Sequence, residues 1–286
     1  MKFKLSIVFI VLISATLLAQ KEKVKGNKIV MTEQKIIDNF SSIEVYDNLQ
    51  VTLMEDSDPM ITIEADSNVQ EFIVYEVVND VLTIKTKADI RRAKALNITI
   101  RCAAALQSLK FYNEVQANAK NSLIASNILI ECHNETEVFL TVEAQQLKAT
   151  AHEKANVTLH TTASEAFYQI NQEAVFKGVV TSDSLTVDLY QNAEAELEGE
   201  VKNLLVRAGL DSEFFGQKLI SGTSKLIAEG KSECYIKSND AITIEAIDEA
   251  EIYLLGEPKI KLDVFLNEAT LYKKNLDYTP NRFILN

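Results

Sequence analysis

The chain of 286 residues has no tryptophan, only three cysteines, three prolines, three histidines and eight glycines. A disulfide-built scaffold needs many more cysteines in a far shorter chain, and an odd number leaves at least one of them unpaired. No Cys-x-x-Cys pair or Cys/His spacing of the kind that binds zinc is present. We therefore expect Cys102, Cys132 and Cys234 to be buried as small apolar residues.

Positive charge is also scarce, with 29 Lys and Arg against 41 Asp and Glu, for a formal net charge of -12. Binding to nucleic acid rewards Lys and Arg placed against phosphate, and docking on anionic lipid rewards basic segments. The balance argues against both classes of partner. For an exported chain, such a charge serves solubility.

The first residues are typical of a secretory signal peptide. Lys2 and Lys4 precede a short apolar run from Leu5 to Ile13, and small residues follow as far as Ala19. A bilayer span needs about 20 apolar residues, so the run is too short for a membrane anchor. Cleavage after Ala19 would remove two lysines and no acids, which moves the net charge from -12 to -14. We expect export to the periplasm or the cell surface, with no stable membrane insertion of the mature chain.

A repeat of about 19 residues begins near Leu109, and each unit holds a short apolar strand, a polar turn and another short strand. Taking the first apolar position after each turn as an anchor gives successive gaps of 21, 19, 19, 19, 19, 20, 18 and 19 residues. The nine anchors are Ala117, Val138, Val157, Phe176, Ala195, Phe214, Cys234, Ile252 and Leu271.

Apolar residues within each unit alternate with a period of two, which is the period of a strand and not of a helix. Two or three short strands cannot close a core alone, but stacked units bury a continuous one. Each strand would then pair in parallel with its equivalent one coil away, at about 4.8 Å. The sequence therefore predicts an all-β fold, a parallel β-helix (β-solenoid), and chain chirality favours the right-handed form.

Polar side chains occupy most of the turns, four residues before the anchor, where Leu210 and Gly230 are the exceptions. Amides stacked at one coil spacing can hydrogen-bond to each other and to the turn backbone. We expect a structural turn ladder that includes Asn113, Asn134, Gln172, Gln191 and Asn267.

The predicted organisation has five parts. They are a signal peptide at 1–19, a flexible lead-in at 20–34, a less regular N-terminal β segment at 35–101 that could cap the solenoid, repeats at 102–277, and a C-terminal tail at 278–286.

The stretch from Phe40 to Leu53, read as FSSIEVYDNLQVTL, resembles the start of the head GIN domain family of autotransporter adhesins. Ile61 to Asp66 and Asn79 to Ile84 continue the likeness, which covers about 36–189. Asn48-Leu49-Gln50 stands where the family carries Gly-Ile-Asn, and most of its later turn glycines are replaced. The resemblance implies a β-helical exported protein of Bacteroidetes type and supplies no catalytic residues.

The sequence offers two candidate ion sites, and each also has a purely structural interpretation. His133 and His152 fall in one turn column on adjacent coils and could form a metal pair, but spacing fixes no third ligand. Alternatively, the two histidines stack with Tyr112 and Tyr190 in a ladder of polar aromatic side chains. Acids beside the anchors could hold calcium or could form a solvated edge.

Three functions remain open from the sequence. The favoured one is a non-enzymatic, adhesin-like protein that contacts an extracellular or envelope glycan or protein with its lateral faces. An envelope scaffold assembled from solenoids is the second, and a polysaccharide-active enzyme is the third. Glycoside hydrolysis needs two carboxylates at a set separation, which the spacing does not provide. We expect no cofactor and no catalytic residue, and Tyr112, Tyr190, Tyr235 and Tyr253 are candidate exposed contacts.

Overall fold

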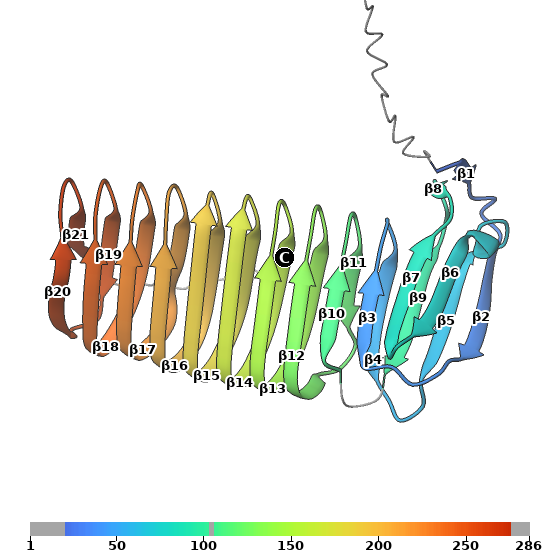
Figure 1. Ribbon diagram of the computed structural model, residues 1–286, viewed down its shortest axis with the longest axis horizontal. Helices are drawn as coiled ribbons and strands as arrows, with labels where there is room; N and C mark the ends of the chain where they lie inside the picture. Colours follow the sequence, from blue (N-terminus) through green and yellow to red (C-terminus); the bar gives the residue numbers. More distant parts are fainter. Residues whose placement is uncertain (1–20, 103–105, 276–286) are drawn as a thin grey trace, which may run out of the picture.

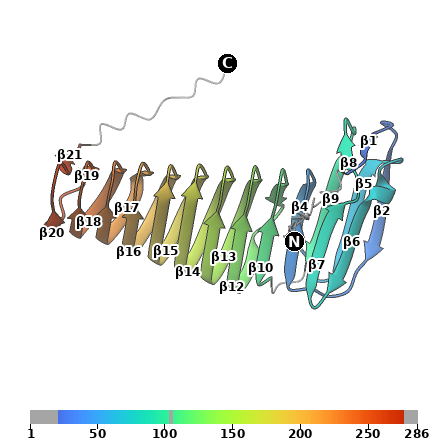
Figure 2. The ribbon, with the colours of Figure 1, turned by 45° about the horizontal axis from the view of Figure 1, so that its top comes forward.

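The computed structural model describes residues 21–102 and 106–275, and they form a rod of stacked β-coils (Figure 1). From residue 106 to residue 275, successive coils lie side by side in chain order along the long axis, as the colour gradient of Figure 2 shows. Apart from one short 3-10 helix at Gln70–Phe72, every element of these residues is a strand. The expected signal peptide and the tail at 278–286 lie outside the described residues.

Long strands make up the coils, and each pairs in parallel with the strand of the next coil. Each long strand bends near its middle, at a residue that the pairing with the next coil skips. These residues are Gln145 in one coil, Ser164 in the next and then Asp183. The strands are β10 (Ser108–Phe111), β11 (Gln116–Ala119), β12 (Leu123–Cys132), β13 (Glu137–Ala151), β14 (Asn156–Gln172), β15 (Val175–Gln191), β16 (Glu194–Ala208), β17 (Glu213–Ala228), β18 (Glu233–Ala246), β19 (Glu251–Leu255), β20 (Lys259–Phe265) and β21 (Thr270–Lys273).

The bend and the polar turn give each coil two flat sides. We call the outer surface of the strand halves that follow each turn, such as 156–162, the leading face. The outer surface of the halves that run to the next turn, such as 165–172, is the trailing face. Side chains alternate between the core and one of these faces, as the burial of β14 shows.

The predicted register is confirmed. All nine anchors pair with one another from coil to coil in a single column, from Ala117 against Val138 to Ile252 against Leu271. A bulge between Glu196 and Glu198 shifts the pairing of β16 with β17 locally, without breaking the anchor column.

The core between the two sides is apolar and closely filled. Phe111, Phe176 and Phe214 are fully buried, as is Tyr168, whose hydroxyl donates to Thr161 Oγ1 at 2.9 Å. All three cysteines are buried and unpaired, as expected. Burial raises the pKa of Cys102 to about 11 and that of Cys234 to about 12, which makes both thiols poor nucleophiles.

The solenoid begins earlier in the chain than residue 102. β3 (Ser42–Val45) and β4 (Gln50–Glu55) pair in parallel with β10 and β11, and on their other side with β7 (Val81–Thr86) and β9 (Leu96–Cys102). β5 (Met60–Asp66) then pairs antiparallel with β9, and β6 (Ile73–Val78) pairs antiparallel with β7. Antiparallel strands therefore close this end.

Residues 20–34 were expected to be a flexible lead-in, and the structure differs. β1 (Lys23–Lys25) pairs with β8 (Asp89–Arg91), and β2 (Val30–Ile36) pairs antiparallel with β5. Val24 packs against the core. The buried Asp66 carboxylate accepts backbone N–H bonds from Lys28 at 2.6 Å and from Lys94 at 2.9 Å, which holds the segment. The sequence did not indicate these strands, because the segment is rich in lysine and most side chains of β2 are exposed.

Phe214→Asp tests the register, since it puts an unpaired charge into a buried column. We expect a loss of at least about 4 kcal/mol in the free energy of unfolding, from lost packing together with an uncompensated charge. Phe215→Asp is the matched control: the next side chain lies on the leading face, half-buried, and should cost about 1 kcal/mol. Urea unfolding of both variants checks this, and equal losses would contradict the register.

Candidate functional site

The polar turns form a ladder that runs along one edge of the rod. All nine turn residues have a positive φ, between 58° at Glu153 and 70° at Gly230. Backbone N–H groups of one coil donate to side-chain oxygens of the next: Asn113 N to Asn134 Oδ1 at 2.9 Å, and Glu153 N to Gln172 Oε1 at 2.8 Å. These bonds satisfy donors that the sheets cannot reach.

The rest of the predicted ladder is less uniform. Asn267 Nδ2 donates to Asp248 Oδ1 at 3.1 Å, which is a bond between side chains. Gln191 lies in the same column with a φ of 69°. Glu153, which is no amide, joins the ladder because its Oε2 accepts from Asn134 N at 2.7 Å. A carboxylate oxygen can therefore take the place of an amide oxygen in the ladder, and Leu210 and Gly230 occupy the same column without a side-chain acceptor.

The two histidines predicted in one column stack face to face, with ring centroids 4.6 Å apart. Tyr112 stacks on His133 at 4.9 Å, and Tyr46 stacks on Tyr112 at 4.6 Å. Tyr190 is separated from this stack by Asn171, whose amide lies 3.3 Å from His152 Nδ1. Within residues 21–102 and 106–275 no group of three or more His, Cys, Asp or Glu could hold a metal ion.

A second aromatic column lies on the leading face near the C-terminal end. Phe215, Tyr235, Tyr253 and Tyr272 stack in turn, with ring centroids 5.6, 4.4 and 5.0 Å apart. Tyr235 and Tyr253 thus point outward, although both are half-buried.

A row of acids accompanies this column, formed by Glu194, Glu213, Glu233 and Glu251 at equivalent positions of four coils. Partial burial, together with the neighbouring Glu194 and Glu233, raises the pKa of Glu213. The Tyr253 hydroxyl donates to Glu251 Oε2 at 2.5 Å. At least one acid of the row is therefore hydrogen-bonded to a tyrosine of the column.

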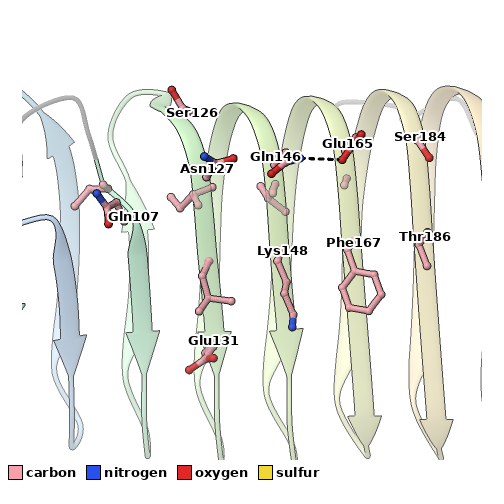
Figure 3. A pocket seen from close by; sticks show the side chains of 15 residues that line it. Gln107, Ser126, Asn127, Glu131, Gln146, Lys148, Glu165, Phe167, Ser184 and Thr186 are labelled. Atoms are coloured by element: carbon pink, nitrogen blue, oxygen red, sulfur yellow. Dashed lines mark hydrogen bonds between the residues drawn. The ribbon is translucent and has the colours of Figure 1, made fainter.

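A large hollow lies on the trailing face, where β12, β13, β14 and β15 run side by side (Figure 3). It has a volume of about 970 Å³ and is open to solvent. Two cross-strand columns form most of its lining. One holds Leu129, Lys148, Phe167 and Thr186, and the other holds Asn127, Gln146, Glu165 and Ser184.

The side chains of this hollow present one apolar surface beside several polar groups. Lys148 Nζ lies 5.5 Å from the centre of the Phe167 ring, within range of a cation–π interaction. Gln146 Nε2 donates to Glu165 Oε2 at 3.1 Å, as Figure 3 shows. These contacts hold an aromatic ring next to amide and carboxylate groups.

The ionisable groups of the hollow are already engaged with other side chains. Its lining contains no His and no Cys. Each of its two carboxylates already has a partner: Glu131 forms an ion pair with Lys110 at 3.3 Å, and Glu165 accepts from Gln146. The spacing of the sequence did not single out this hollow, but Phe167 at an outward position of the period-two pattern was a readable signal.

Comparison with known proteins identifies the class. The model of the family described as "Putative auto-transporter adhesin, head GIN domain" matches residues 39–179 and again 169–258, so the chain belongs to this family. No curated protein matches the chain.

Solved structures share the fold. A "putative adhesin" from Parabacteroides merdae is 19% identical with a TM-score of 0.62, covering 89% of this chain and 100% of that one. A "putative adhesin" from Parabacteroides distasonis is 14% identical with a TM-score of 0.64, covering 88% and 100%. A "Putative lipid binding protein" from the same species is 16% identical with a TM-score of 0.56, covering 89% and 100%. In the described part of this chain, no helix has the length and apolar character needed to cross a membrane.

Because the two histidines are stacked, we expect the free energy of unfolding to depend on pH. Burial and the neighbouring His152 lower the pKa of His133 in the folded chain, although Glu153 and Glu131 oppose this. The unfolded state then binds more protons as the pH falls below the usual histidine pKa of about 6.5, so stability is present above that pH and is lost below it.

His133→Phe keeps a ring in the stack and cannot be protonated. Between pH 7.5 and pH 5.5, the free energy of unfolding should therefore fall less for this variant than for the natural chain. Urea unfolding at both pH values measures the difference, and equal falls would show that His133 does not couple folding to pH.

Proposed function

We propose that the protein is an exported, non-enzymatic, adhesin-like binding protein that uses the lateral faces of its solenoid to contact a glycan polymer. The hollow on the trailing face carries the proposal. It spans four coils, is open along the rod, and combines the Phe167 ring with amide, hydroxyl and carboxylate groups.

An extended sugar chain matches this chemistry. The faces of a hexose ring are apolar and can pack on an aromatic ring, while its hydroxyl groups need donors and acceptors at the edges. Asn127 and Gln146 offer both kinds of group, and Ser184 adds a hydroxyl. Equivalent positions recur once per coil, at about 4.8 Å, so a long ligand can meet several coils at once.

The family supports the same class of role. The names of the matched family and of two structural relatives describe adhesins, and the third relative is named as lipid-binding. A lipid ligand would favour a closed apolar cavity, whereas this hollow is open and bordered by Lys148, Glu131 and Glu165. A glycan is therefore the preferred ligand.

Binding to a broad panel of bacterial and host glycans tests the proposal, with Phe167→Ser as the variant. Loss of the ring should weaken binding roughly tenfold, which corresponds to about 1.4 kcal/mol. Phe139→Ser is the matched control, because Phe139 is an exposed ring on the leading face of the neighbouring coil. Its affinity should not change.

Two results would contradict the proposal. One is the absence of binding across the whole panel, and the other is an equal loss in both variants. Release of reducing or unsaturated sugar from any glycan of the panel would indicate the enzyme instead.

A further inference from the structure

The two ends of the rod are built differently. At the N-terminal end, β2 and β6 pair antiparallel with β5 and β7 and close the stack. At the other end, β20 pairs only with β18 and β21 pairs only with β19 among the described strands (Figure 1). The far edges of both strands therefore present free backbone N–H and C=O groups.

The core is also uncovered at this end. Ile242 and Ile244 of β18 are 1% and 0% exposed, whereas the residues paired with them in the same inward columns, Ile260 and Leu262, are 50% and 49% exposed. Their burial would require one more layer of strand. An apolar strand with a free edge is a site where another strand can dock.

We propose that this end binds the same end of a second copy of the chain, with β20 pairing antiparallel to β20 of that copy about a two-fold axis at Leu262. A two-fold axis across the rod reverses the strand direction, so it makes the paired edges antiparallel without any change of conformation. It also brings the exposed Leu262 side chains of the two copies together.

The charge pattern of β20 fits this register. The pairing of β20 with β18 is regular from Lys259 to Leu262 and then skips Asp263. With Leu262 opposite its own equivalent, Lys261 faces the part of the second copy's strand that carries Asp263, and Asp263 faces the part that carries Lys261. Within one copy these residues already form an ion pair at 2.7 Å. The dimer would thus join two such pairs with alternating sign, which stabilises directly opposite residues of a sheet.

Net charge points to the same end. Copies with a formal charge of -12 repel one another when they approach side by side. The last coil, however, carries Lys259, Lys261, Lys273 and Lys274 against Glu257, Asp263 and Glu268, so it has no excess of acid. Contact through this end therefore brings together a part of the rod that has little net charge.

The dimer is expected to be weak, because a single strand edge buries much less than the roughly 800 Å² per partner of a standard interface. It would nevertheless carry two trailing-face hollows on one rod. If the hollow binds a polymer as proposed above, two linked sites would raise the apparent affinity.

Charge reversal tests the contact in the full exported chain by sedimentation over a range of concentrations. The natural chain should dimerise reversibly. Lys261→Asp places four acids at the axis and Asp263→Lys places four lysines, so each should weaken the dimer at least tenfold. The double variant Lys261→Asp/Asp263→Lys restores the pairing and should restore the dimer. Both residues are on the surface, so folding should be unaffected.

Cysteine cross-linking tests the register independently of glycan binding. Leu262→Cys should form a disulfide between copies under mild oxidation, because the axis places it opposite itself at a distance a disulfide can bridge. Lys259→Cys is the control, since its equivalents would lie about 20 Å apart. The natural cysteines are buried and should not interfere.

The outcomes separate this inference from its alternatives. A monomer at all concentrations, with the β20 amides protected from hydrogen exchange, would mean that the chain covers its own end. Equal cross-linking at both positions would indicate unspecific contact through the edge. Either result would overturn the proposal and would leave the glycan site on the trailing face untouched.

Discussion

Parallel, in-register stacking of the coils is the constraint on which the rest of the molecule depends. Each residue meets its equivalents one coil above and below, so each position becomes a column. A column is stable only if its side chains tolerate contact with their own kind or alternate in charge. Apolar residues fill the core columns, oxygen acceptors occupy most of the turn column, and stacked rings form two outer columns.

Charged residues follow the same constraint. On the trailing face Asp188 accepts two bonds from Arg207 of the next coil, at 2.7 and 2.8 Å. On the leading face Lys177 pairs with Glu196, and Lys218 pairs with Glu198. The row of four acids is an exception, and its repulsion agrees with the raised pKa of Glu213. Stacking thus leaves long flat faces whose chemistry changes slowly along the rod, as suits contact with an extended partner.

Much of the fold could be predicted from the sequence, because stacking requires equivalent residues to recur at a nearly constant spacing. The spacing from Ala117 to Leu271 placed every anchor in the correct column, and polar residues at a fixed offset marked seven of the nine turns. The N-terminal strands were harder to predict: β1 and β2 depend on long-range pairing and on the buried Asp66, which leave no period in the sequence. The trailing-face hollow was also missed, since it is lined by outward side chains from several coils. Chain spacing alone does not show this.

Location tests the central claim most directly, because an adhesin-like protein at the cell surface must reach its ligand outside the cell. The measurement is cleavage of the protein by added protease on intact source cells, compared with lysed cells. Cleavage on intact cells is the predicted result. Protection until lysis would place the rod in the periplasm and contradict an adhesin-like role at the surface.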